Sequence, residues 1–226
     1  MPITMVVLAC LAIVPLPNSG HDSLFAQSLE VSGLVISFLG LLLRCMTIGH
    51  TPAGTSGRNT ERQVAVSLNT TGVYSIVRHP LYLANFLIGL GLAVFTLNPW
   101  FVATYILTFW LYYERIMMAE EQFLLESFGT QFSDWADRTP AFIPCFRNHV
   151  RSTLPFSFRN VLRREYNTVL QIVVVSFILE LIGDAIDQKK FQLSMPWIIF
   201  LCSGLAVWGI LRTLKRHTHL LDVPGR

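Results

Sequence analysis

The sequence predicts an all-α, polytopic membrane protein with about six transmembrane helices, and two observations support this prediction. Charged residues make up only 14% of the 226 residues, whereas soluble domains contain about 25%. The mean hydropathy is +0.50, and uncharged apolar stretches recur along the whole chain. One soluble core does not account for apolar residues spread in this way, so we interpret residues 1–226 as a single transmembrane domain.

Six apolar stretches are close to the length that a membrane span requires. A hydrocarbon core of about 30 Å needs roughly 20 residues of helix. The stretches cover residues 2–19, 31–49, 81–97, 99–115, 167–184 and 193–212. The pair Asn98 and Pro99 interrupts the uncharged run from Leu81 to Tyr113, which predicts two helices joined by a very tight turn.

Basic residues predict the orientation of the helices. They gather in segments 50–80 and 114–166 and after residue 212, and in a six-helix arrangement these three segments share one face. Arg and Lys are enriched in cytoplasmic loops, so we expect this face to be cytoplasmic, in the inner membrane if the source is bacterial. Apolar spans separate the positive charges, which argues against a nucleic-acid partner. The four cysteines show no C-x-x-C spacing, so we expect no metal site.

A polar element precedes the stretch at 81–97. It runs from Gly72 to Tyr82 and contains Arg78, His79 and Pro80. Proline is favoured at the first position of a helix, so a helix is expected to begin here. The free N–H groups of a helix N-terminus attract anions, and Arg78 and His79 add further donors. The element therefore suits a carboxylate or a phosphate.

An acidic pair, Glu120 and Glu121, follows the stretch at 99–115. If the two helices form a hairpin, this pair returns to the same interface as Arg78 and His79. A cationic cluster beside an acidic cluster matches the two ends of a zwitterion. S-adenosylmethionine is such a molecule, because it carries a carboxylate, an ammonium group, ribose hydroxyls and a sulfonium.

Residues 70–144 resemble the integral-membrane methyltransferases that include isoprenylcysteine carboxyl methyltransferase and the phospholipid methyltransferases. The resemblance consists of the G-x-Y-x-x-x-R-H-P-x-Y element, the Glu pair after a hairpin, and the T-P-A-F-I-P sequence at 139–144. It implies S-adenosylmethionine as cofactor, a lipid or lipidated acceptor, and Arg78 and Glu121 as catalytic residues. It further implies that the cofactor is held by Tyr74, Arg78, His79, Pro80, Tyr82, Glu120 and Glu121. Ala84 departs from the family, which often has glycine there.

The acceptor is expected near segment 51–60, which contains Arg58, Asn59, two glycines and several hydroxyl residues but no acid. Arginine binds carboxylates and phosphates through two hydrogen bonds, so we assign Arg58 and Asn59 to the acceptor and Arg58 also to catalysis. This favours an acidic acceptor, with a lipid phosphate of the lipid A type preferred over a prenylcysteine carboxylate. The alternative is a loop whose arginine only marks the cytoplasmic side.

Two other classes of function remain open at this point. The architecture also resembles sterol-type membrane reductases, which use a nicotinamide cofactor. Alternatively, the protein has no catalytic activity, and its charged loops only anchor the helix ends. In that case Arg78 and His79 are interfacial positive charges, and Glu120 and Glu121 lie on a solvated helix face. The sequence does not predict an oligomeric state.

Overall fold

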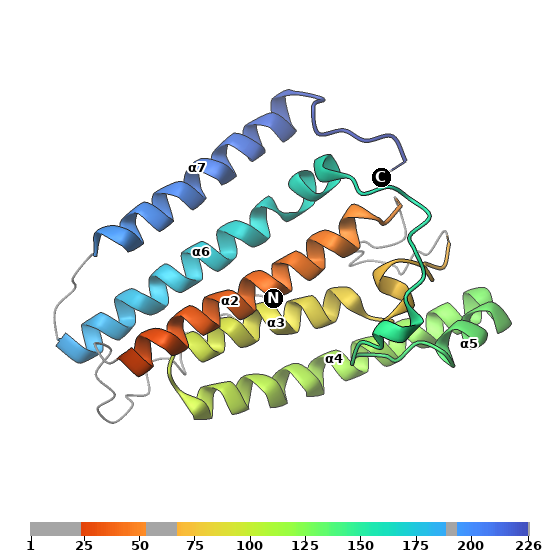
Figure 1. The fold of residues 1–226 in the computed structure, drawn as a ribbon, viewed down its shortest axis with the longest axis horizontal. Coiled ribbons are helices and arrows are strands. Elements are labelled where there is room, and N and C mark those ends of the chain that lie inside the picture. Colours follow the sequence, from red (N-terminus) through yellow and green to blue (C-terminus); the bar gives the residue numbers. More distant parts are fainter. Residues whose placement is uncertain (1–23, 53–66, 189–193, 226) are drawn as a thin grey trace.

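The computed structural model describes residues 24–52, 67–188 and 194–225. Its long helices lie side by side in one elongated bundle (Figure 1). The helices are α2 (Leu24–Gly49), α3 (Pro80–Phe95), α4 (Pro99–Phe128), α5 (Thr130–Ala136), α6 (Phe158–Gln188) and α7 (Met195–His217), with 3-10 turns η1 (Val73–Ser75) and η2 (Phe146–Asn148). Within the described residues, the only β pairing is an isolated bridge from Gly72 to Val150. The all-α prediction is therefore confirmed.

Among the described residues, three helices are long and apolar enough to cross a membrane, at Leu24–Gly49, Phe158–Ala185 and Met195–His217. The predicted count of six spans is not confirmed. Helix α3 has 16 residues, which at 1.5 Å per residue gives about 24 Å, short of a 30 Å core. Helix α4 has 30 residues, but charged side chains begin at Glu114. The predicted span at residues 2–19 lies outside the described residues.

The tight turn predicted between residues 97 and 99 is present and joins α3 to α4. Helix α3 ends at Phe95, and α4 begins at Pro99 in the first helical position. The side chain of Asn98 accepts hydrogen bonds from the backbone N–H groups of Trp100 and Phe101, at 3.0 and 3.1 Å. These bonds satisfy N–H groups that have no partner within the helix, so a short polar residue fixes where α4 starts.

Helices α2 and α3 approach each other closely through small residues. A Cβ atom placed on Gly91 would lie 2.2 Å from the Gly33 carbonyl oxygen. Next to this contact, the Ser37 hydroxyl donates to the Ile88 carbonyl oxygen at 2.9 Å. Small side chains allow helix backbones to meet in this way in membranes. Helix α2 therefore provides a closely fitted support for α3.

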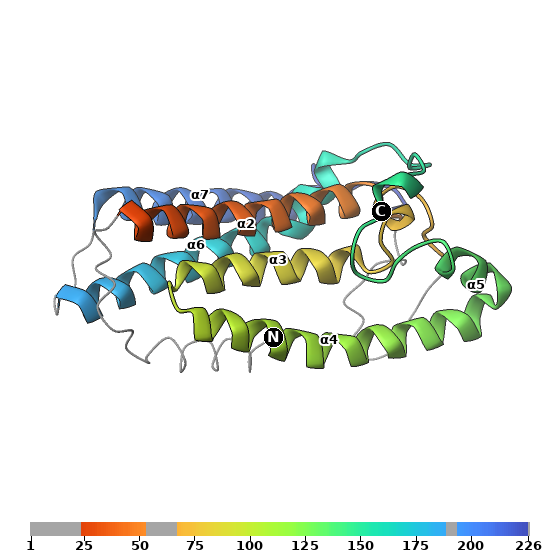
Figure 2. The ribbon, with the colours of Figure 1, turned by 60° about the horizontal axis from the view of Figure 1, so that its bottom comes forward.

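The longer segments that connect the helices lie at one end of the bundle. In Figures 1 and 2 the C-terminal ends of α2, α4 and α7 and the N-terminal ends of α3 and α6 all point toward the right-hand side of the picture, where α5 follows α4. The arginine-rich segments leave the helices at this end, as expected for one shared face. The site described below lies there too, where α3 begins and α4 continues beyond α3.

Candidate functional site

The element that carries Arg78 and His79 is held in place by main-chain hydrogen bonds. The backbone N–H groups of Arg78 and His79 donate to the carbonyl oxygens of Pro140 and Ala141, at 2.9 and 3.2 Å. The N–H of Cys145 donates to the carbonyl oxygen of Ile76 at 2.8 Å. Two segments more than 60 residues apart in the sequence therefore run side by side, and the polar element has a fixed backbone.

The beginning of this element is fixed as well. Gly72 has φ +63°, a left-handed conformation that glycine adopts at low cost, and its N–H donates to the Val150 carbonyl oxygen at 2.8 Å. The indole N–H of Trp135, in α5, donates to the Tyr74 carbonyl oxygen at 3.1 Å. Helix α5 thus contacts the same element and closes that side of the site.

The acidic pair lies directly against Arg78 and His79, because α4 continues past the expected boundary at residue 115 to Phe128. The Nε2 atom of His79 is 2.8 Å from Oε1 of Glu121. Arg78 Nε is 3.2 Å from the same oxygen, and His79 Nδ1 is 3.7 Å from Glu120 Oε2. The structure therefore brings together two pairs of polar residues that lie some forty residues apart in the sequence.

Two polar atoms in this cluster are buried and have no hydrogen-bond partner among the described residues. They are Oε2 of Glu120 and Nε of Arg78, whose 3.2 Å contact with Glu121 lacks the angles of a hydrogen bond. One is a donor and the other is an acceptor. Buried polar groups are normally paired, so the two atoms mark positions at which a ligand with both an acceptor and a donor fits. The carboxylate and ammonium of an amino acid have this combination.

The charges of the cluster depend on one another. The pKa of Glu121 is lowered from its ordinary value of 4.5, mainly because His79 hydrogen-bonds to the carboxylate, and Arg78 adds to this effect while burial opposes it. His79 itself is buried, with 5% of its surface exposed. Burial also raises the pKa of Tyr74, and the charge of Glu120 adds to that rise. These shifts favour the ionised form of Glu121 and the neutral form of Tyr74.

Aromatic rings continue from His79 along the contact between α3 and α4. The His79 ring stacks on Tyr82 with centroids 5.5 Å apart, and Tyr82 lies 5.2 Å from Tyr113 of α4. Pro80, at the first position of α3, is buried. The sequence interpretation singled out Tyr82 but not Tyr113. The i to i+4 spacing of Tyr105, Phe109 and Tyr113 on α4 was the available signal.

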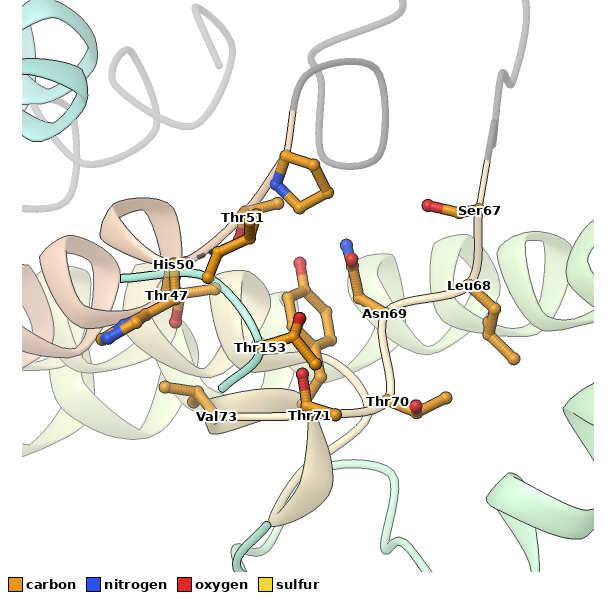
Figure 3. Close-up of a pocket in the computed structure, with 13 residues that line it drawn as sticks. Thr47, His50, Thr51, Ser67, Leu68, Asn69, Thr70, Thr71, Val73 and Thr153 are labelled. Atoms are coloured by element: carbon orange, nitrogen blue, oxygen red, sulfur yellow. Dashed lines mark hydrogen bonds between the residues drawn. The ribbon is translucent and has the colours of Figure 1, made fainter. Parts of the chain in front are cut away.

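A polar cavity of about 210 Å³ lies beside Tyr74, at the C-terminal end of α2 (Figure 3). Threonine hydroxyls dominate its wall, and none of the described residues that line it is acidic. Asn69, Thr70, Thr71 and Thr153 have side chains that make no hydrogen bond within the described parts of the chain. Thr51 lines the cavity and begins the segment that the sequence assigned to the acceptor, but Arg58 and Asn59 lie outside the described residues.

A buried ion pair inside the bundle was missed by the sequence interpretation. Arg44 of α2 contacts Glu165 of α6 through Nε and a terminal nitrogen, at 2.8 and 2.9 Å. The other terminal nitrogen donates to the side chain of Asn85 in α3. Charged side chains within apolar spans are costly without a partner. An arginine inside the stretch 31–49 was therefore the signal that an acid lies nearby.

These features define an integral membrane protein of helical hairpins with a small polar site at one end. Residues 34–126 match the Isoprenylcysteine carboxyl methyltransferase (ICMT) family. The matched segment contains α3, the hairpin, and the Arg78, His79, Glu120 and Glu121 cluster. The resemblance predicted from the motifs is therefore confirmed.

Individual relatives agree with this match. The cobalt-zinc-cadmium resistance protein CzcN of Cupriavidus metallidurans is 37% identical over 116 residues, which are 49% of this chain and 53% of that protein. The protein-S-isoprenylcysteine O-methyltransferase of Tribolium castaneum is 31% identical over 118 residues, 50% of this chain and 40% of that protein. The enzyme of the same name from Saccharomyces cerevisiae is 30% identical over 125 residues, 54% of this chain and 52% of that protein.

The chain spans about half the length of these curated relatives. The family match thus covers the core around the hairpin and ends before α6 and α7. No solved structure matches the chain.

Proposed function

We propose that the protein is an S-adenosylmethionine-dependent methyltransferase that acts on an acidic group of a membrane-embedded lipid or lipidated molecule, with residues 70–144 as its cofactor-binding core. The supporting observation is the cluster of Arg78, His79, Glu120 and Glu121, which contains a buried donor atom and a buried acceptor atom that make no hydrogen bond among the described residues. The family match of residues 34–126 supports the same reaction.

The roles of the site residues follow from their charges. Arg78 and the N-terminal end of α3 bind the cofactor carboxylate, because both supply hydrogen-bond donors to an anion. Glu120 accepts from the ammonium. Glu121 keeps the His79 ring in place through their 2.8 Å contact, with Tyr74, Pro80 and Tyr82 completing the wall. When bound, S-adenosylmethionine supplies an electrophilic methyl group on a positively charged sulfur.

An acidic acceptor fits the surroundings of this site. A carboxylate or phosphate is already ionised near neutral pH, so the protein needs no strong general base to activate it. Alignment of the two reactants in a water-poor pocket then supplies most of the rate enhancement. The names of two of these relatives favour a prenylcysteine carboxylate over the lipid phosphate that segment 51–60 alone suggested. In this proposal the polar cavity beside Tyr74 and the predicted ligand Arg58 receive the acidic group.

The active site faces the cytoplasm in this proposal. Arginine-rich segments leave the bundle at the same end as the site, and such segments remain on the cytoplasmic side. In a bacterium this places the protein in the inner membrane. A cysteine-labelling topology map tests the orientation, and labelling of the site end from the outside would contradict it.

Cofactor binding tests the proposed reaction most directly. The detergent-purified protein is titrated with S-adenosylhomocysteine and, separately, with NADPH by isothermal titration calorimetry. Saturable binding of S-adenosylhomocysteine alone is expected. Binding of NADPH alone would favour the sterol-type reductase, and binding of neither would favour a non-catalytic membrane protein.

The acceptor is identified in a second experiment with methyl-labelled S-adenosylmethionine. Membranes that contain the protein are incubated with farnesylated N-acetylcysteine or with a total lipid extract, and the labelled product is treated with base. A base-labile methyl ester on the cysteine derivative supports the carboxylate. Label recovered as a methyl phosphate ester supports the phosphate. Label on a lipid amine, or in neither the cysteine derivative nor a lipid, would contradict an acidic acceptor.

A further inference from the structure

The strongest unassigned feature beside the charged cluster is a corner formed by two tyrosine rings. Tyr82 of α3 and Tyr113 of α4 have centroids 5.2 Å apart and ring planes inclined at 59°. Both side chains are partly exposed. Phe109, by contrast, is only 6% exposed, and it stacks on Tyr113 with centroids 4.0 Å apart and planes 14° apart.

The stacking on Phe109 fixes the Tyr113 ring. One face of Tyr113 is covered by Phe109, and the ring is inclined toward Tyr82. Tyr82 in turn stacks on the His79 ring, with centroids 5.5 Å apart. The corner is therefore continuous with the charged cluster, and neighbouring rings fix its orientation.

We propose that Tyr113, together with Tyr82, forms an aromatic wall that recognises the positive charge on the sulfonium of S-adenosylmethionine. The faces of aromatic rings carry negative charge density and attract cations within about 6 Å of the ring centre. In this cofactor the sulfonium lies two methylene groups from the carbon that carries the ammonium and carboxylate. A ring next to His79 is therefore in reach of the charge once Arg78 and Glu120 hold the amino-acid end.

The aromatic wall also distinguishes the cofactor from its demethylated product. Loss of the methyl group converts the sulfonium of S-adenosylmethionine into the neutral thioether of S-adenosylhomocysteine. An aromatic wall attracts the first and not the second, so Tyr113 favours binding of the cofactor and release of the product. This inference rests on the proposed function, and Tyr113 is a specificity-determining residue within it.

The test compares two ligands that differ in charge at this sulfur. S-adenosylmethionine and S-adenosylhomocysteine are titrated separately into the full-length protein without an acceptor, and the ratio of the two dissociation constants is measured. The variants are Tyr113→Leu, which removes the ring, Tyr113→Phe, which retains it, and Tyr112→Leu as a control. Tyr112 is 57% exposed, and its ring meets the Tyr113 ring edge-on with centroids 5.4 Å apart. Tyr112→Leu therefore controls for lost packing against Tyr113 while the Tyr113 ring remains.

Tyr113→Leu is expected to raise the dissociation constant of S-adenosylmethionine about 10-fold, in the range that one cation–aromatic contact provides. The dissociation constant of S-adenosylhomocysteine is expected to change less than about 2-fold. Tyr113→Phe and Tyr112→Leu retain the wild-type ratio. Equal losses for both ligands in Tyr113→Leu would overturn the inference, because the ring would then contribute only packing. Failure of the wild-type protein to bind either ligand would instead overturn the proposed function.

Discussion

Helix α3 presents two different faces to its neighbours. Toward α2 it is packed backbone to backbone through Gly91 and Gly33, whereas toward α4 it is separated by aromatic side chains such as Phe86, Tyr105 and Phe109. The first contact leaves no room for an added atom. The second is built from rings, whose side-chain conformations adjust to a ligand more easily than a backbone does. The support and the binding surface of α3 are thus on opposite sides of one helix.

The largest expected effect tests the α2 side. Gly91→Ala adds a Cβ atom 2.2 Å from the Gly33 carbonyl oxygen and 2.5 Å from the Ser37 backbone nitrogen, so the two helices must separate. Overpacking of this kind costs about 3 kcal/mol. We expect the free energy of unfolding in detergent to fall by about that amount.

Gly209→Ala in α7 is the matched control, because nothing lies within 4 Å of the added atom. This variant is expected to be as stable as the wild type or slightly more stable, since alanine favours helix. Equal stability of both alanine variants would show that the close contact between α2 and α3 does not matter.

The next largest effect is expected at Glu121, where α4 contacts the start of α3. Glu121→Gln removes the negative charge that contacts His79 and Arg78. Hydrogen bonds to charged groups contribute about 1.5 to 3 kcal/mol, so S-adenosylhomocysteine is expected to bind about 10-fold more weakly or worse by calorimetry at neutral pH. The variant is also expected to melt at a lower temperature than the wild type at that pH. Glu126→Gln, at an exposed position on the same helix, serves as control. Equal affinities in the two variants would remove Glu121 from the site.

A smaller loss of stability is expected for a change at Tyr105, further along the contact between α3 and α4. The Tyr105 hydroxyl donates to the Phe86 carbonyl oxygen at 3.0 Å, and Tyr105→Phe removes this bond while retaining the ring. The free energy of unfolding should fall by about 1 kcal/mol, and cofactor affinity should remain unchanged. A drop in affinity without a loss of stability would mean that the binding surface extends further along α4 than we infer.

The smallest effect is a pH dependence. Because the pKa of Glu121 is below its ordinary value of 4.5 in the folded protein, its ionised form stabilises the fold. This contribution is fully present above about pH 4.5 and is lost as the pH falls through the lowered pKa. Melting temperatures of wild type and Glu121→Gln, measured between about pH 3 and 7, should therefore converge toward acid. A difference independent of pH would contradict this assignment.

Much of the fold was predictable, because apolar length and turn residues are local signals. The expected helices at 31–49, 81–97, 99–115, 167–184 and 193–212 all have counterparts. The count of six membrane spans is not confirmed, and it depends on features that local signals do not determine. The residues near Phe95 and Glu114 do not indicate how deeply a short helix such as α3, or a helix with a charged second half such as α4, enters the bilayer.

The charged cluster was predictable for a similar reason. A hairpin has to return Glu120 and Glu121 to the start of α3, so their distance in the sequence did not hide their proximity. The ion pair between Arg44 and Glu165 was not predictable, because it depends on how α6 packs against α2 across more than a hundred residues. The alignment of residues 138–150 beside residues 72–79 also depends on main-chain hydrogen bonds, which leave no side-chain pattern.

The ion pair between Arg44 and Glu165 constrains how this chain can be recombined with its relatives. Arg44 belongs to the segment that matches the family, whereas Glu165 lies beyond its last matched residue. A chimera that keeps the matched segment and takes its later helices from another protein must supply an acid facing Arg44. Without that acid the guanidinium stays uncompensated in an apolar interior, so the two parts of the chain must be exchanged as a unit.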